Sequence, residues 1–340
     1  MSRVTEHEIL TASELAAAGL PFPARQRPSL YEKQIGDRIF KIVTGIFAVI
    51  VILIGLWIGL QSYGIASPVF KSIGWWRFIV GKTWDPVSKV FGALPFIFGT
   101  LVTSAIALLI ATPLGLGAAL FLAELAPKWL RQIVLPLIEL LAVIPSVVYG
   151  LWGIFVLVPL MANSIEPFLI LHFGDSPFFR GYPLGVGMLT GGIILSVMIV
   201  PFIVSVSQEV IRAVPNSLRE GMVALGATRW EVLKKIVLPY GRAGIFGAII
   251  LGLARALGET MAVTMVIGNT PQISASLLDP GYTMAAVIAN EFTEATYDFY
   301  VSALVAIAFV LFIITIIVNV LARLLIWRVG KGPRLIGGAR

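Results

Sequence analysis

The chain has 340 residues, of which 58% are hydrophobic and 13% are charged. An ordinary soluble domain is about 45–50% apolar and about 25% charged, so this composition indicates a membrane protein. The chain has no cysteine and only two histidines, which excludes disulfides and thiol catalysis and leaves a Cys/His metal cluster unsupported. The formal net charge is +7. Its basic residues lie at the tails and between apolar stretches, a pattern typical of membrane orientation rather than nucleic-acid binding.

Residues 1–41 are polar and basic with several prolines, and they predict a cytoplasmic N-terminal tail. The first apolar stretch, 42–60, is too long and too far from residue 1 for the apolar region of a cleaved signal peptide. We therefore expect it to remain as a membrane helix, followed by a periplasmic loop over 61–93. Three tryptophans in this loop suit either a membrane-interface belt or burial in a small external cap: Trp75, Trp76 and Trp84.

A helix needs about 20 mainly apolar residues to cross the hydrocarbon core of a bilayer. Five further stretches meet that length: 94–123, 133–161, 186–206, 244–267 and 301–327. Together they predict a permease core over 94–327, followed by a cytoplasmic tail over 328–340. Lysine and arginine gather on the side of the N-terminus, with the first outer loop as an exception. By the positive-inside rule we expect an all-α polytopic protein of six transmembrane helices with both termini in the cytoplasm.

The loop 208–241 between the fourth and fifth stretches is long and patterned, and it predicts two short helices. Ser217 precedes Glu220 by three residues and Thr228 precedes Glu231 by three, and each pair predicts a capping box at a helix start.

Gly226 falls between the two short helices, where a helix C′ position favours a residue that tolerates positive φ. Pro239 is expected to end the second helix. Leu225, Trp230 and Leu233 give this polar segment an apolar surface that must be buried. Burial on the chain itself and burial on a partner protein both remain open at this point.

The loop resembles the E-A-A-x3-G-x9-I-x-L-P segment of the integral membrane subunits of ABC importers. The matching positions are Glu220, Gly226, Ile236, Leu238 and Pro239. The chain departs from the pattern at Gly221 and Met222, where the family has alanines. The resemblance implies that the two short helices, with Trp230 and Leu233, dock in a groove on an ATPase subunit. The chain has no G-x-x-x-x-G-K-[ST] run, so ATP and Mg are expected on a separate ATPase and no cofactor on this chain.

Arg255 and Glu259 lie inside the fifth apolar stretch. An ionisable group near the centre of a bilayer costs about 2.5–3.5 kcal/mol even on the lenient insertion scale. One interpretation is an i, i+4 ion pair that locks the helix bundle. The other is a solute pathway, because an arginine fork offers paired donors to an oxyanion and stays charged. Thr260, next in the chain, belongs to the same candidate pathway. Ser146 follows a proline in the third stretch and could either contact the solute or cap the backbone.

Three segments together resemble the first permease subunit of bacterial phosphate ABC importers, the PstC type: the run around Arg255, IPSVVYGLWG (144–153) and TMAAVIANEFTEA (283–295). The resemblance covers about residues 90–327 and the first span. It implies the type I ABC importer (MetI-like) permease fold with cytoplasmic coupling helices. It also implies transport of phosphate and functional importance for Arg255 and Glu259.

The same resemblance implies a heterodimer with a homologous second permease, two ATPase subunits and a periplasmic phosphate-binding protein. We expect a transport subunit with no catalytic or metal site in the bacterial inner membrane, surrounded by lipid. A permease for another oxyanion (sulfate, molybdate or a phosphonate) would carry the same loop. An ion-gradient-driven carrier and a membrane scaffold are the alternatives from other classes, and neither explains both the loop and the buried charges.

Overall fold

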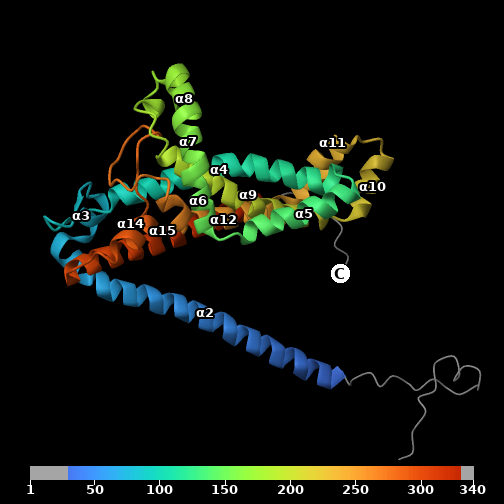
Figure 1. Ribbon diagram of the computed structural model, residues 1–340. Helices are drawn as coiled ribbons and strands as arrows, with labels where there is room; N and C mark the ends of the chain where they lie inside the picture. The colour runs from blue at the N-terminus through green and yellow to red at the C-terminus, as the bar shows by residue number, and fades with distance from the viewer. Residues whose placement is uncertain (1–29, 331–340) are drawn as a thin grey trace, which may run out of the picture. The chain divides into compact units, whose positions relative to one another are not determined.

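The computed structural model describes residues 30–330, and the remaining parts of the predicted tails lie outside this range (Figure 1). The chain divides into two compact units, 1–58 and 59–340, which are described separately. In the first unit the described residues form the first part of helix α2 (Leu30–Ile73). Apolar side chains such as Phe47, Leu53 and Trp57 are exposed along it. This helix extends well beyond the predicted span 42–60 at both ends.

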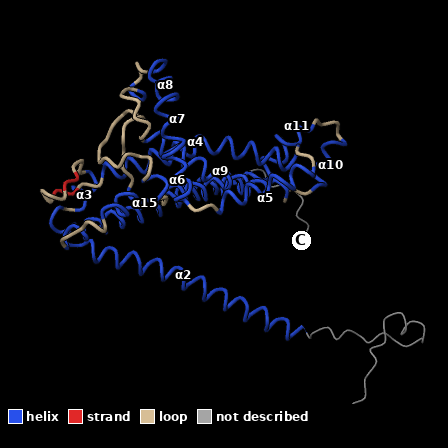
Figure 2. The backbone as a smooth tube through the Cα atoms, viewed as in Figure 1, coloured by secondary structure: helices blue, strands red, loops and turns tan. Residues whose placement is uncertain are grey.

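The second unit is mainly helical, with several loops and one antiparallel hairpin of two residues per strand (Figure 2). After the end of α2, its regular elements are α3 (Trp75–Val80), β1 (Trp84–Asp85), β2 (Val90–Phe91), α4 (Leu94–Leu120), α5 (Lys128–Val143), α6 (Ser146–Trp152), α7 (Val158–Leu160), α8 (Glu166–Phe173), α9 (Met188–Arg212), α10 (Asn216–Ala224), α11 (Arg229–Val232), α12 (Leu238–Leu257), α13 (Met261–Thr264), α14 (Met284–Glu291) and α15 (Asp298–Gly330). Single π-helical turns follow α4, join α6 to α8, and join α11 to α12: Phe121–Leu125, Gly153–Leu157, Met161–Ile165 and Leu233–Val237.

Within residues 30–330, six helical stretches are long and apolar enough to cross a membrane. They are Gly36–Ile73, Leu94–Leu125, Ser146–Phe173, Met188–Arg212, Arg229–Leu257 and Asp298–Trp327. The expected number of spans is therefore confirmed, although two of the predicted ranges are wrong.

The third predicted span, 133–161, is not a single helix. The chain breaks at Ile144 and Pro145, where the backbone is extended, because the residue before a proline disfavours the helical region. Helix α5 thus has 16 residues, about 24 Å at 1.5 Å per residue, and is shorter than a full span. The long apolar stretch begins only at Ser146.

The fifth predicted span, 244–267, begins too late and ends too late. The helix is continuous from Arg229 to Leu257, so Pro239 does not end the second short helix as expected. A π-helical turn lies directly before α12, whose second residue is this proline. The missing N–H of a proline is tolerated near the start of a regular helical stretch, and the wider turn gives its ring room.

Helix α9 is the central helix of the second unit. The side chain of Ile203 is fully buried between two glycines, Gly115 on α4 and Gly252 on α12. A Cβ atom at Gly115 would lie 2.8 Å from Cγ2 of Ile203, and one at Gly252 would lie 3.3 Å from Cγ1. Small residues that let helix backbones approach closely are the usual means of helix packing in membranes. These contacts hold α4 and α12 against α9.

The hairpin and α14 form a small cap at the end of the bundle that carries α3 (Figure 1). Trp84 is 7% exposed, and its Nε1 donates to Oε2 of Glu291 at 2.8 Å. The hydroxyl of Tyr300 donates to the same oxygen at 2.6 Å. Of the two roles considered for the outer tryptophans, the cap role is therefore the one that Trp84 takes. Trp76 is exposed.

Candidate functional site

Helices α10 and α11 lie together at the opposite end of the bundle from α3, called here the α10 end (Figure 1). As predicted, Gly226 occupies the turn between them with φ +84°, a left-handed conformation that favours glycine. The predicted capping box of Thr228 with Glu231 is also present. The Glu231 amide donates to Oγ1 of Thr228 at 3.3 Å, and the Thr228 amide donates to Oε2 of Glu231 at 3.0 Å.

The other predicted capping box, Ser217 with Glu220, is absent. The residue before α10 is Pro215, and no side chain caps the helix start. The helix begins at Asn216, two residues earlier than the box requires, because Pro215 with its fixed φ already precedes the first turn. Glu220 is instead exposed on the surface of α10.

The apolar side chains of this segment divide into two groups. Leu233 is buried, and Ile236 and Leu238 are partly buried against the chain's own core. Leu225 and Trp230 remain 84% and 67% exposed. The first group is thus buried on the chain itself, whereas the second group is not. The first group anchors the helix pair to the bundle, and the second leaves an apolar surface free.

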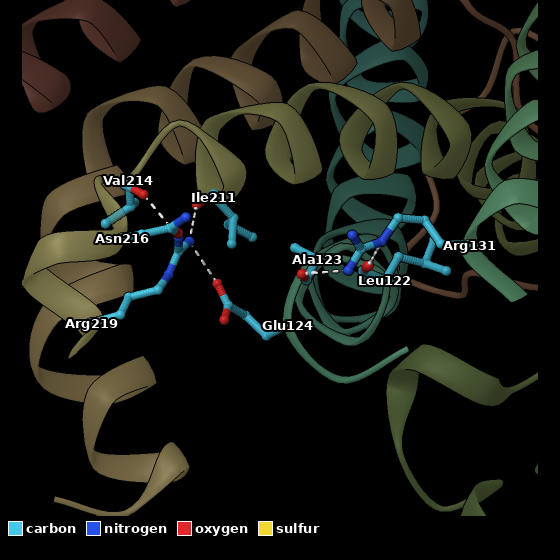
Figure 3. Close-up of polar contacts among 8 residues, drawn as sticks. All are labelled: Leu122, Ala123, Glu124, Arg131, Ile211, Val214, Asn216 and Arg219. Atoms are coloured by element: carbon cyan, nitrogen blue, oxygen red, sulfur yellow. Dashed lines mark hydrogen bonds and ion pairs between the residues drawn. The ribbon is translucent and has the colours of Figure 1, made fainter. Parts of the chain in front are cut away.

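Arg219, which the sequence patterns did not single out, ties α10 to the bundle (Figure 3). Its Nη2 donates to Oε1 of Glu124 at 2.8 Å and to the carbonyl of Ile211 at 2.7 Å. Its Nη1 donates to the carbonyl of Val214 and to Oδ1 of Asn216, both at 2.8 Å. One guanidinium therefore joins the π-helical turn after α4, the end of α9 and the start of α10.

A groove of about 530 Å³ lies beside this contact, and Glu124, Arg219 and Trp230 are among its lining residues. Most of its wall is apolar, including Leu120 and Val223. A partner element that inserts at the α10 end would therefore meet an apolar surface next to a fixed ion pair.

The second candidate site is the junction between α12 and α13. Helix α12 ends at Leu257, so Arg255 lies in its last turn and Glu259 lies beyond it. The expectation that both charges sit within one helix is therefore wrong. Among the described residues, the ion pairs are Arg219 with Glu124 and Lys235 with Glu231. The structure thus shows no ion pair between Arg255 and Glu259 in residues 30–330.

The Arg255 guanidinium instead lies over the ring of Phe202 on α9, with Cζ 4.4 Å from the ring centroid. This distance is within the range of a cation–π contact. Its Nε atom is buried and has no hydrogen-bond partner among the described residues. Glu259 accepts a hydrogen bond from the backbone N–H of Ala262 at 3.4 Å. The two charged groups are thus held separately, and the arginine keeps unused donors.

Ser146 and Thr260 also lie at helix breaks. Ser146 is the first residue of α6, and no side chain caps this helix, so the backbone-capping role considered for Ser146 is absent. Thr260 directly precedes α13, and its hydroxyl is 3.4 Å from the Gly258 carbonyl. Helix α6 packs directly on α13, because a Cβ atom at Gly150 would lie 3.2 Å from Cα of Ala262.

Helix α13 follows the end of α12 and packs on α6, so the structure brings α6, α12 and α13 to one region. Broken helices inside a membrane leave backbone polar groups free, and such breaks are tolerated where they line a cavity or pathway. In the part of the chain that the structure describes, no group of three acidic or histidine side chains could hold a metal ion. The chemistry available here is hydrogen bonding and charge attraction toward an anion.

Comparison with known families identifies the class of this fold. Residues 111–331 match the model of the family described as binding-protein-dependent transport system inner membrane component. A solved bacterial alginate ABC transporter, in complex with an alginate-bound periplasmic protein, has a chain of the same fold. The TM-score is 0.54 at 17% identity, over 90% of this chain and 99% of that one. The chain belongs to the binding-protein-dependent transport inner membrane component family, with the type I ABC importer permease fold.

Several relatives are each called phosphate transport system permease protein PstC. The Xylella fastidiosa (strain Temecula1) protein is 53% identical over 75% of this chain and 79% of its own. The Mesorhizobium japonicum protein is 45% identical over 86% and 90%, and the Haemophilus influenzae protein is 44% identical over 85% and 93%. These matches confirm the resemblance to PstC-type permeases. They also confirm the expectation of a membrane transport subunit, and the family description names dependence on a binding protein.

Proposed function

We propose that this chain is the PstC-type permease that moves inorganic phosphate across the bacterial inner membrane. The observation that carries the proposal is the Arg255 guanidinium, held against Phe202 at a helix junction with its buried Nε unpartnered. A planar guanidinium offers paired donors to a tetrahedral oxyanion and needs no proton to stay charged. The names of the relatives give phosphate as the oxyanion.

In the proposed pathway Arg255 attracts the anion and Glu259 accepts a proton-bearing oxygen of it. Ser146 at the start of α6 and Thr260 before α13 supply hydroxyl groups. Their positions at helix breaks support contact with a solute. The half-buried state of all four residues supports a polar interior rather than a lipid-facing surface. One charged arginine is attractive enough for an anion to enter yet allows it to leave, which conduction requires.

The proposed assembly is a heterodimer with a homologous second permease, two ATPase subunits that bind ATP and Mg, and a periplasmic phosphate-binding protein. Leu225 and Trp230, exposed beside Gly226, support docking of the ATPase at the α10 end. Both termini and residues 208–241 are assigned to the cytoplasm, because that orientation gathers most loop lysines and arginines there.

The test is the ATPase activity of the reconstituted complex with its binding protein, in the presence of phosphate, sulfate or molybdate. We expect stimulation by phosphate alone. Stimulation by sulfate or molybdate and not by phosphate would assign the chain to another oxyanion importer. Uptake that persists without an ATPase subunit and follows an ion gradient would make it a carrier and overturn the proposal.

A further inference from the structure

A second groove at the α10 end is lined by basic side chains and is separate from the Arg255 junction. Its volume is about 450 Å³, and it lies between α5 and the end of α9. The lining residues are Lys128, Arg131, Gln132, Leu135, Pro136 and Arg212. Three of these carry a positive charge, and no acidic side chain is among the described residues that line the groove. An anion is therefore the ligand that its charge favours.

Arg131 gives the groove a fixed donor. Its Nε donates to the carbonyl of Leu122 at 2.6 Å, and its Nη2 donates to the carbonyl of Ala123 at 2.7 Å (Figure 3). These contacts use two of the five N–H donors of the guanidinium. The carbonyls belong to the turn after α4, so the arginine is positioned by the backbone and not by a carboxylate. No carboxylate within residues 30–330 forms an ion pair with it.

The residues of α5 that line the groove form one face of the helix, at positions three to four apart. Lys128, Arg131 and Gln132 occupy the first turns, and the apolar Leu135 and Pro136 follow one turn later. A basic end followed by an apolar wall matches an anionic headgroup with the beginning of an acyl chain. Glu139, exposed on the next turn, confines an anion to the first two turns of α5.

The surroundings of this face also suit a lipid. Helix α5 has no buried residue, and Trp129, Ile133 and Leu137 on it are 63%, 55% and 55% exposed. Basic pockets between membrane helices commonly hold the headgroups of anionic lipids. We propose that the groove between Lys128, Arg131 and Arg212 binds one anionic phospholipid, such as phosphatidylglycerol, through its phosphate.

This site borders the joint made by Arg219. A neighbouring groove of about 350 Å³ shares Arg131 and Arg212 and also includes Glu124 and Arg219. A headgroup that contacts both α5 and α9 therefore stabilises the end of the bundle from which α10 departs. The site is independent of which solute the permease carries.

The test is native mass spectrometry of the full-length chain, titrated with phosphatidylglycerol or phosphatidylcholine. The variant is Lys128→Gln with Arg212→Gln, which removes two exposed charges and keeps the structural Arg131. Each basic residue near an anionic headgroup contributes about a fivefold change in affinity, so the double variant should bind phosphatidylglycerol about 25-fold more weakly. Each single variant should lose about fivefold. The matched control is Arg323→Gln, an exposed arginine on α15, which should leave binding unchanged.

If Arg323→Gln weakened phosphatidylglycerol binding equally, the effect would come from general surface charge and the site would be overturned. Equal affinity of the double variant and the wild type would also overturn it. Displacement of phosphatidylglycerol by inorganic phosphate, at an ionic strength where sodium chloride does not displace it, would assign the groove to free phosphate instead. Retention of the lipid by the isolated chain but not by the chain in its complex would assign the groove to an acidic partner surface. Either result would overturn the lipid assignment.

Discussion

The Arg255 guanidinium faces the ring of Phe202 at 4.4 Å rather than the carboxylate of Glu259. A stacked arginine retains its in-plane N–H donors, whereas an ion-paired one has given some of them to the carboxylate. The contact with α9 therefore fixes the direction of the guanidinium while leaving it able to bind an anion. This arrangement supports a role of Arg255 in the solute pathway and argues against its role as an ion-paired lock of the helix bundle.

The first prediction concerns the charge at Arg255. Arg255→Lys keeps the positive charge but loses the planar fork and its stacking on Phe202. Hydrogen bonds to charged groups are worth about 1.5–3 kcal/mol, so phosphate uptake per assembled complex should fall about tenfold or more. Arg255→Ala should impair uptake at least as much. Uptake of radiolabelled phosphate, normalised to complex recovered from the membrane, measures both variants.

The double variant Arg255→Gln with Glu259→Gln separates the two roles. If the two residues formed a buried ion pair, neutralising both would restore protein level and uptake, because neither charge would be stranded. Since the structure holds them apart, we expect uptake to stay low with a normal protein level. Recovery of uptake would make Arg255 a structural residue.

The second prediction concerns the turn between α10 and α11. Gly226 has φ +84° and open space around its Cβ position, so Gly226→Val adds backbone strain without a steric clash. A left-handed backbone costs an L-residue about 1–2 kcal/mol, more for a β-branched one. The turn should change conformation and ATPase association should weaken, which co-purification measures.

Gly221 supplies the matched control. It lies within α10, also with open space around it, but without positive φ. Gly221→Ala should leave association intact and stabilise the helix by about 0.5–1 kcal/mol. Normal ATPase association in Gly226→Val would remove the main support for docking at this turn.

Much of this fold could be predicted from local pattern. The six apolar stretches, the turn at Gly226 and the capping box at Thr228 each depend on residues close in sequence, where propensity acts directly. The break at Pro145 was also readable in principle, because a proline restricts the residue before it. Pro239 carries the same signal, yet the helix continues through it, since a π-helical turn precedes it. Local rules do not reveal which prolines the surrounding backbone accommodates.

The candidate sites depended more on contacts between distant segments. Arg219 reaches Glu124 across 95 residues, and Arg255 reaches Phe202 on another helix. No spacing in the sequence indicates either contact. The i, i+4 spacing of Arg255 and Glu259 even favoured a pair that the end of α12 at Leu257 prevents. Patterns locate unusual residues, but the tertiary packing decides their partners.

The third prediction concerns orientation. The chain has no cysteine, so single cysteines report accessibility without background. Ser217→Cys at the start of α10 and Val87→Cys in the hairpin turn are both at exposed positions. In intact cells, an impermeant maleimide should label Val87→Cys only, and permeabilisation should expose Ser217→Cys. The reverse labelling pattern would place α10 and α11 outside and contradict docking of a cytoplasmic ATPase.

The last prediction concerns the joint between Arg219 and Glu124. Their side chains are 18% and 21% exposed, and Arg219 also satisfies the carbonyl of Ile211. If this joint transmits motion from α10 to α4 and α9, Glu124→Gln should lower the amount of phosphate transported per ATP hydrolysed. Its effect on the free energy of unfolding should be small. A double-mutant cycle with Arg219→Met should give a coupling energy of about 1 kcal/mol, since partly exposed pairs are worth little in stability.

The chain offers a matched ion pair for comparison. Lys235 contacts Glu231 at 3.2 Å on the same short segment, with side chains 60% and 41% exposed, and it joins no second helix. Lys235→Met should therefore leave the ratio of transport to hydrolysis unchanged. The reconstituted complex gives both rates, and thermal unfolding of the same samples gives stability. An unchanged ratio in both Glu124→Gln and Arg219→Met would contradict the transmission role. A loss of stability with an unchanged ratio of transport to hydrolysis would make the pair only structural. The ratio, and not the melting temperature, therefore decides whether this joint couples ATP hydrolysis to transport.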